Sequence, residues 1–360
     1  MGYSTDTHPA AIRHYRVGGI GFGIEIESPW KEMEYSETVK RRIDDAAAGK
    51  ASPVVPVRAG DKEPSRTFVQ GKDELVPGCD SHSLDLSAER VFSTNDGDSS
   101  GGTRISGEDD VFRLRILAPE SVTPDTTGLI TEIKDTLPRY LVHSCQDGTL
   151  IKMDSGRDTL GSLLISSDFS TGEYFPARGM TARRVSGMTN ILLRMMVTYN
   201  SVSVPSLMMH SSVVAKNGEA VMFLGASGTG KSTHSRLWLE NIPGTELVND
   251  DNPILRLEDG QAYVYGTPWS GKTPCYRNVR FPVKAIVRLT QGPENRISRV
   301  SGLHAYASLM GAASTVRWER RVMEAVITTA SKIAEVVPFF DLQCLPDADA
   351  ARICHDVIGL

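Results

Sequence analysis

Hydrophobic residues recur with two different periods along this chain, and each period predicts a different kind of element. In the first half, apolar and polar residues alternate with a period of two, most clearly at 111–117, which predicts a β-strand with one buried face. Further strand-length segments, separated by turn-forming residues, lie at 14–27, 140–143, 150–153, 160–166 and 173–175. These segments predict an antiparallel meander, with which the strand or bent hairpin at 14–27 could pair.

In the second half, segments with helical spacing alternate with short apolar runs. Helices are predicted at 186–199, 318–336 and 347–358, the last with Asp347 as its N-cap. Strands are predicted at 207–214, 220–224, 281–289 and 339–344. The run at 220–224 is apolar at every position, as expected of a strand buried in a parallel sheet. The fold class predicted for this half is therefore α/β.

The segment from about 49 to 110 follows neither period. It is poor in large apolar residues and rich in Ser, Gly, Asp and Pro, a composition typical of a flexible insertion rather than a packed layer. Short islands within it, at 67–70 and 90–92, could still be edge strands. We therefore predict a mainly β N-terminal domain at 1–180, which contains this insertion, and a second domain at 181–360.

The apolar run at 220–224 leads into a glycine-rich turn with the pattern G-x-x-x-x-G-K-S. Glycines let successive backbone N–H groups curl toward an anion, and the helix predicted at 233–239 adds partial positive charge and free donors at its start. The lysine of this pattern reaches nucleotide phosphates, and the serine hydroxyl can complete the ligand shell of Mg²⁺. The predicted site for ATP and Mg²⁺ consists of Gly225, Ala226, Ser227, Gly228, Thr229, Gly230, Lys231, Ser232 and Thr233.

Two adjacent carboxylates, Asp250 and Asp251, end an apolar segment downstream of this turn. Phosphoryl transfer needs a carboxylate that holds Mg²⁺ and, where a hydroxyl attacks, a carboxylate that accepts its proton. Two acids at the end of a strand can supply both, although the same residues could instead cap a turn. Lys272, Arg277 and Arg280 follow in and after a loop rich in Gly and Pro. They are candidate clamps for a phosphoryl group or an anionic substrate, unless they are solvated surface cations.

Composition narrows the classes of partner. The formal net charge of −5 gives no basic surface for nucleic acid, and no apolar run reaches the roughly eighteen residues of a membrane-spanning helix. The N-terminus lacks the pattern of a secretion signal. Five scattered cysteines without paired spacing favour free thiols in a reducing compartment. We therefore expect a cytoplasmic protein that binds neither nucleic acid nor membrane.

The segment from about 210 to 289 resembles the HPr kinase / phosphoenolpyruvate carboxykinase superfamily. Three features carry the resemblance: the loop GASGTGKS at 225–232, the sequence LVNDD at 247–251, and His210 on the strand before the loop. Together they cover about a quarter of the chain. The resemblance implies a P-loop domain of that superfamily, preceded in this chain by the mainly β domain.

The resemblance also implies roles for individual residues. Lys231 and the loop backbone would bind the phosphates of ATP, while Ser232 and Asp251 would hold Mg²⁺. Asp250 would act as the general base toward a substrate hydroxyl, with His210 close to the two acids.

Other parts of the chain depart from the superfamily. Arg277 is similar in position to an arginine of a later family element, although Tyr276 stands where the family has glycine. The N-terminal half does not resemble the regulatory domain of HPr kinases, and the second-metal Lys/His pair of carboxykinases is not evident. The leading hypothesis is an ATP- and Mg²⁺-dependent kinase that phosphorylates a hydroxyl of a peptide, a protein or a small molecule. A carboxykinase-type transferase and a nucleotide-gated sensor are the alternatives, and a homo-oligomer is an option by analogy alone.

Overall fold

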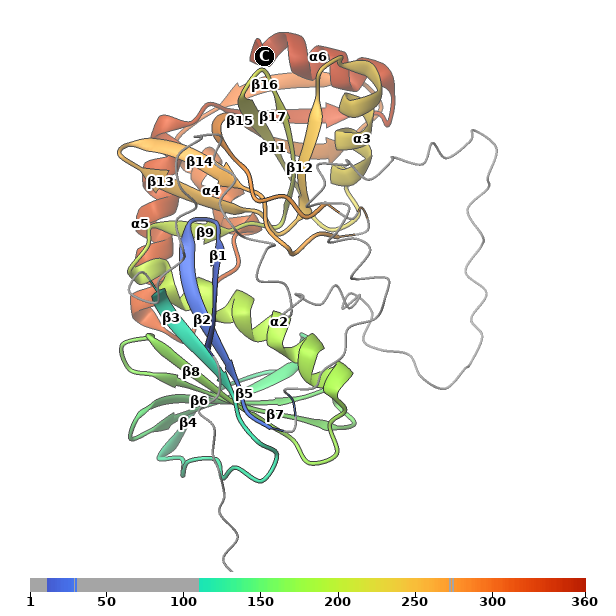
Figure 1. Cartoon of the computed structure of the whole chain (residues 1–360). Helices are drawn as coiled ribbons and strands as arrows, with labels where there is room; N and C mark the ends of the chain where they lie inside the picture. Colours follow the sequence, from blue (N-terminus) through green and yellow to red (C-terminus); the bar gives the residue numbers. More distant parts are fainter. Residues whose placement is uncertain (1–11, 29, 31–109, 272, 274) are drawn as a thin grey trace, which may run out of the picture.

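The computed structural model describes residues 12–28, 30, 110–271, 273 and 275–360. These residues form a mixed α/β structure with two sheets, and the helix α2, Ala182–Tyr199, lies between them (Figure 1). The predicted insertion up to residue 109, with its two islands, lies outside the described residues.

The first sheet has eight strands in the order β1-β2-β3-β8-β7-β6-β5-β4. Their bounds are β1 Ile12–Val17, β2 Ile20–Ile26, β3 Asp110–Ile116, β4 Gly128–Ile133, β5 Arg139–Cys145, β6 Gly148–Asp154, β7 Thr159–Ser166 and β8 Thr171–Pro176. The strands β4 to β8 pair antiparallel in sequence order, which confirms the predicted meander and extends it by β4. The strand β4 was not predicted because both of its faces are largely exposed.

The segment at 14–27 forms a hairpin. Its strands β1 and β2 pair antiparallel across a turn at Gly18 and Gly19, which both have a positive φ that favours glycine. The strand β2 then pairs with β3, and β3 pairs with β8, in both cases in parallel. The hairpin therefore joins the meander through β3, and the first sheet is mixed rather than purely antiparallel.

The second sheet contains nine strands, and its path runs β12-β10-β11-β15-β14-β13-β9, with β17 paired to β15 and β16. Their bounds are β9 Ser206–Met208, β10 Ser211–Lys216, β11 Glu219–Leu224, β12 Glu246–Asp251, β13 Ile254–Glu258, β14 Gln261–Tyr265, β15 Arg280–Gln291, β16 Arg296–Val300 and β17 Phe339–Cys344. The strand β11 is parallel to β15 but antiparallel to β10. The predicted parallel environment of β11 is therefore present on one side only, because a tight turn at Asn217 and Gly218 leads β10 directly into β11.

The remaining helices lie in the second half of the chain. They are the short η3 Asn200–Val202, α3 Lys231–Asn241, α4 Leu303–Ala312, α5 Arg320–Val336 and α6 Ala348–Ile358. Asp347 caps α6 by accepting a hydrogen bond from the N–H of Ala350 at 2.9 Å, which confirms the predicted N-cap. The helix α4 was not predicted, and its buried residues are Ala305 and Leu309.

Apolar side chains cover both faces of the second sheet. On one face, Phe223 and Val287 pack with Trp238 of α3 and Cys354 of α6. The other face packs into a larger core that continues through α2 to the first sheet. Met196 of α2 is buried beside Gly172 of β8, where a Cβ would lie 2.8 Å from the methionine sulfur. Within the described residues, no helix combines the length and the apolar character needed to cross a membrane.

The single strand predicted at 207–214 is wrong, because the chain forms two strands there. The strand β9 pairs with β13, whereas β10 pairs with β11 and β12. The break falls at Met209 and His210, where the His210 N–H donates to the carbonyl of Ala312 at 2.7 Å. His210 therefore stands just before β10, with 49% of its side chain exposed.

Candidate functional site

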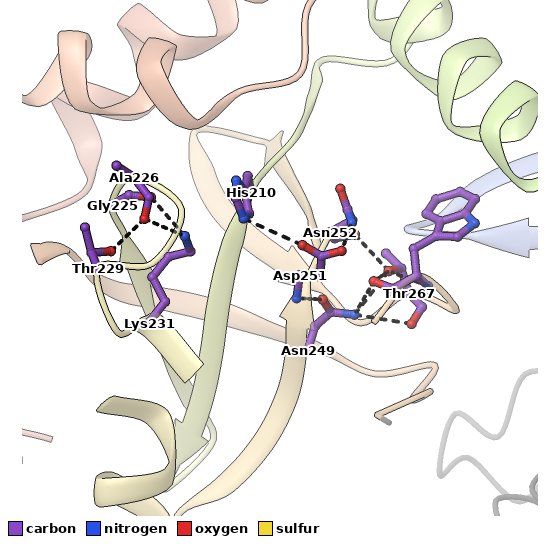
Figure 2. A network of polar contacts seen from close by, with 10 residues as sticks. His210, Gly225, Ala226, Thr229, Lys231, Asn249, Asp251, Asn252 and Thr267 are labelled. Carbon is purple, nitrogen blue, oxygen red and sulfur yellow. Dashed lines mark hydrogen bonds and ion pairs between the residues drawn. The ribbon is translucent and has the colours of Figure 1, made fainter. Parts of the chain in front are cut away.

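Three neighbouring strands of the second sheet have an end on the same side of the sheet, where β10 begins and β11 and β12 end. This row of strand ends is called the edge of the second sheet. The strand β10 lies between β11 and β12 and is antiparallel to both. In this register Ser212 lies opposite Phe223 on one side and Asp250 on the other. The glycine-rich loop, residues 225–230, therefore meets His210 and the acids of β12 at this edge, as Figure 2 shows for the loop, His210 and Asp251.

The glycine-rich loop has a backbone that requires glycine. Gly225, Gly228 and Gly230 have φ angles of 154°, 83° and 100°, in the region that L side chains rarely adopt. At Gly225 a Cβ would also lie 2.5 Å from the hydroxyl oxygen of Thr229. The N–H and the hydroxyl of Thr229 both donate to the carbonyl of Ala226, at 3.2 and 2.8 Å. The loop is thus folded by its own contacts, and α3 begins directly after it, with first-turn N–H groups that have no partner within the helix.

Lys231 is the first residue of α3, and its side chain folds back over the loop. Its ammonium donates to the carbonyls of Gly225 at 2.9 Å and Ala226 at 3.3 Å, and only 9% of the residue is exposed. Burial lowers the pKa of this ammonium, whereas the charges of Asp251 and Asp250 raise it. The loop therefore carries a buried cation whose counter-charges are the two acids of β12.

Asp251 and His210 face each other beside the loop. Asp251 Oδ1 lies 3.7 Å from His210 Nε2, and Asn252 Nδ2 donates to Asp251 Oδ2 at 2.5 Å. Burial raises the pKa of Asp251, and the positive charges of His210 and Arg194 oppose this change. Burial and the charge of Lys231 lower the pKa of His210, while Asp251 raises it. Both side chains retain access to solvent, so this pair can exchange protons with a bound molecule.

Asp250 differs from its neighbour because nothing satisfies its side chain. The residue is 5% exposed, and neither carboxylate oxygen has a hydrogen-bond partner among the described residues. A buried carboxylate without donors costs free energy. Ser211 Oγ and Trp269 Nε1 are also buried without partners, and both residues belong to segments bonded to the end of β12. A group of buried, unpartnered polar atoms is the arrangement expected where a ligand completes a site.

Asn249 fixes the end of β12, and the sequence analysis gave it no role. Its buried side chain accepts the N–H of Asp251 at 2.9 Å and donates to Thr267 Oγ1 at 3.1 Å. Thr267 in turn donates to the carbonyl of Asn252 at 2.8 Å (Figure 2). This network holds both acids against the loop that follows β14. The signal in the sequence was a polar residue directly after the apolar pair Leu247 and Val248 and directly before the two acids.

Arg277 lies away from the acids. Its Nη1 donates to the carbonyl of Leu247 at 2.9 Å, and its Nη2 pairs with Glu246 at 2.7 Å. Both partners stand at the start of β12, whereas Asp250 and Asp251 stand at its end. The guanidinium therefore braces β12 and is not directed at the glycine-rich loop.

Arg280, a second candidate for a phosphoryl clamp, is engaged elsewhere in the second sheet. Arg280 pairs with Glu258 at 3.1 Å and lies over the ring of Tyr263. Lys272 lies outside the described residues. The residues that the structure does bring together are Lys231, Asp250, Asp251 and His210.

Arg194 on α2 is a second residue that the sequence analysis missed. It is half-buried, and its charge acts on Asp251 more strongly than that of Lys231. In Figure 2 the ribbon of α2 lies beyond Asn252, on the opposite side of Asp251 from Lys231. No motif marked Arg194, because its helix is recognised in the sequence only by the spacing of apolar residues.

The chemistry of this edge suits an oxyanion and a hydrated cation. Within the described part of the chain, no group of three or more His, Cys, Asp and Glu side chains gathers as a metal site. The exposed Ser232 at the start of α3 and the two acids of β12 are nevertheless the oxygen ligands that Mg²⁺ prefers, and Mg²⁺ usually keeps several waters. The edge can therefore bind an anion at the loop, hold a hydrated cation beside it and accept a proton.

Comparisons with known proteins are limited in extent. A family model described as SynChlorMet cassette protein ScmC matches residues 180–345. Among solved structures, the HPr(Ser) kinase/phosphatase from Coxiella burnetii is 14% identical, over 42% of this chain and 88% of its own, with a TM-score of 0.26. This superposition is weak and assigns no activity to the present chain. No curated protein matches the sequence.

Proposed function

We propose that this protein is an ATP- and Mg²⁺-dependent phosphotransferase that moves the γ-phosphoryl group of ATP to a hydroxyl of a peptide, a protein or a small molecule. The observation that carries the proposal is the meeting of Lys231 and its glycine-rich loop with Asp250 and Asp251 at one sheet edge. Neither carboxylate oxygen of Asp250 has a partner among the described residues, which is the state expected of a group reserved for a reacting molecule.

The glycine-rich loop fits the phosphates of a nucleotide. Its positive φ angles at Gly225, Gly228 and Gly230 turn the backbone into a concave shape in which N–H groups can point at an anion. The first turn of α3 adds N–H donors and the positive end of the helix dipole. Lys231, now bonded to two loop carbonyls, would exchange these partners for phosphate oxygens. Residues 225–233 would thus hold the triphosphate.

The residues beside the loop fit Mg²⁺. Ser232 would contribute its hydroxyl and Asp251 a carboxylate oxygen, with water in the remaining positions. When bound, Mg²⁺ would neutralise charge on the phosphate oxygens and so favour phosphoryl transfer. The Asn252 amide, which donates to Asp251 Oδ2, would keep Asp251 Oδ1 oriented, and Asn249 would fix the backbone of both acids.

Asp250 would accept the proton of the attacking hydroxyl. Its burial removes water that would compete for this position, and its unpartnered oxygens can receive a hydroxyl without first breaking a hydrogen bond. General-base assistance of this kind contributes about 10²–10⁴-fold to turnover. His210, 3.7 Å from Asp251, would add a positive charge close to the transferred group when it is protonated.

Transfer of labelled γ-phosphate tests the proposal. Purified protein would be incubated with labelled Mg-ATP and an extract of its source cells, beside the variants Lys231→Ala and Asp250→Asn. Asp168→Asn is the matched control, because it makes the same carboxylate-to-amide change in an exposed turn of the first sheet. We expect label on a hydroxyl compound with the unaltered protein and with Asp168→Asn only. Binding of ATP without transfer or release of phosphate would contradict the proposal and favour a nucleotide-gated sensor.

A further inference from the structure

Arg194 carries a half-buried guanidinium without an anionic partner. Its side chain makes no hydrogen bond or ion pair with any residue that the structure describes, whereas the side chain of Arg184 on the same helix pairs with Asp158 at 3.0 Å. A guanidinium presents five N–H donors, and removing it partly from water is unfavourable unless those donors are used. Arg194 is therefore a cation in a place where a bound anion would satisfy it.

The position of Arg194 is set by the fold. The opposite side of α2 is buried through Leu192, Leu193 and Met196. The end of the helix is held by Tyr199, whose hydroxyl accepts the indole N–H of Trp318 at 2.8 Å. Because the helix is firmly packed, the backbone position of Arg194 is fixed, as is required of a residue that binds a ligand. Arg194 therefore stands on a helix that packs against the first sheet, while its charge acts on Asp251 of the second sheet.

The helix that carries Arg194 lies apart from the glycine-rich loop. The charge of Arg194 attracts the Asp251 carboxylate, and α2 lies on the side of Asp251 away from Lys231 (Figure 2). Asp251 therefore lies between the glycine-rich loop and α2. In phosphoryl transfer the attacking and leaving oxygens lie on opposite sides of the transferred group. If the loop holds the leaving group, the attacking molecule approaches from the side of α2.

We propose that Arg194 binds an anionic group, a carboxylate or a phosphate, on the hydroxyl-bearing acceptor. A guanidinium pairs with either group through two parallel hydrogen bonds. Ile191 and Met195, both half-buried, flank Arg194, so the acceptor meets an apolar surface around a single cation. The helix α2 thereby makes the first sheet part of the substrate site. The word acceptor rests on the proposed phosphotransfer, whereas the anion site itself does not.

An anion titration tests the site without relying on turnover. The full chain would be saturated with Mg²⁺ and a non-hydrolysable ATP analogue, so that the loop is filled. Sulfate would then replace chloride at constant ionic strength while the melting temperature is measured. The variant Arg194→Gln is compared with Arg183→Gln, an exposed arginine of the same helix, because sulfate also stabilises proteins without binding at one site. Arg194→Lys keeps the charge but not the paired donors.

We expect the half-saturating sulfate concentration to rise at least about tenfold in Arg194→Gln, as for the loss of a charge-assisted contact, to rise less in Arg194→Lys and to stay unchanged in Arg183→Gln. Coincident titrations of the unaltered protein and Arg194→Gln would overturn the proposal. So would a tenfold loss of affinity for the ATP analogue in Arg194→Gln, since Arg194 would then serve the nucleotide phosphates.

The transfer assay separates this proposal from the proposed function. With a labelled acceptor in hand, Arg194→Gln should raise the KM for the acceptor and leave the KM for ATP unchanged. An unchanged KM for the acceptor would overturn the acceptor role. Failure of all phosphate transfer would instead defeat the proposed function, while the sulfate titration would still decide whether Arg194 binds an anion.

Discussion

Asp168 of the first sheet and Asp250 of the second differ in how their carboxylates are satisfied, and this difference separates scaffold from candidate site. In the first sheet, Asp168 accepts hydrogen bonds from the Ser166 hydroxyl at 2.7 Å and from the Ser170 N–H and hydroxyl at 3.1 and 2.8 Å. In the second sheet, Asp250 is buried, and no described residue donates to its carboxylate. A turn acid satisfied by its own loop stabilises the fold, whereas a buried acid without donors destabilises it. Such an acid is expected where a ligand needs it.

The arginines repeat this contrast. Arg115 lies among Glu25, Glu27 and Glu173 on the first sheet and pairs with all three. The side chain of Arg194, on the helix between the two sheets, has no such ion-pair partner among the described residues. What distinguishes the two places is therefore not the type of charged residue but whether the fold supplies its partner. The predictions below test this distinction.

The largest effect on the affinity for nucleotide is expected at Lys231. Replacing it with alanine removes a charged donor from the glycine-rich loop, and a hydrogen bond to a charged group is worth about 1.5–3 kcal/mol. The affinity for Mg-ATP, measured by calorimetry, should fall by about 10–100-fold. Lys134→Ala removes a cation that pairs with Glu132 on the surface of the first sheet and should leave this affinity unchanged. Equal affinities in the unaltered protein and Lys231→Ala would remove the loop from the site.

A smaller effect, on stability, is expected at Asn249. Asn249→Ala deletes a buried amide and leaves the Asp251 N–H and the Thr267 carbonyl without their partner. The free energy of unfolding, measured with denaturant, should fall by about 2 kcal/mol. Asn241→Ala is the control, because that half-buried amide donates to the Leu237 carbonyl within its own helix, α3, and its loss should cost less. A loss of transfer activity larger than the loss of folded protein would show that Asn249 also positions the two acids.

The smallest effect concerns pH and the first sheet. The hydroxyl of Ser166, with the N–H and hydroxyl of Ser170, lowers the pKa of Asp168 to about 2. Between about pH 4 and pH 2 the unfolded chain binds a proton at this carboxyl before the folded chain does, so stability contributed above pH 4 is lost as the pH falls. Because Asp168 is exposed, the loss should stay below about 1 kcal/mol. Denaturant unfolding should show a larger difference in the free energy of unfolding between the unaltered protein and Asp168→Asn at pH 5 than at pH 2.5. The same difference at both pH values would contradict this.

Local patterns predicted most of the elements. The period-two segments of the first half are strands, and helical spacing located α2, α5 and α6, because in each case one face is buried and the other is not. The pattern of apolar and polar residues was less informative where the two faces of a segment are both exposed or both buried. The strand β4 was missed because it is exposed on both faces, and the break at His210 was missed because residues 206–209 are buried throughout.

The candidate site was predictable where it is local and unpredictable where it is assembled by the fold. The motif around Lys231 and the paired acids could be read directly, since their spacing in the chain reflects a continuous loop and a strand end. Arg277 could not be placed, because only the structure shows it bonded to Leu247 and Glu246. Arg194 was missed for the related reason that α2 meets Asp251 only through the packing of two sheets. The boundaries of the two domains and the roles of the site residues stay predictions.

The most direct test of the central claim compares Asp250→Asn with Asp168→Asn in two measurements, the melting temperature without ligands and the rate of phosphate transfer. We expect Asp250→Asn to melt no lower than the unaltered protein, because the amide replaces a buried carboxylate that accepts no hydrogen bond from a described residue. Its turnover should fall by about 10²–10⁴-fold. Asp168→Asn should melt slightly lower and keep its turnover. An Asp250→Asn protein that melts lower yet transfers phosphate within tenfold of the unaltered rate would contradict the account.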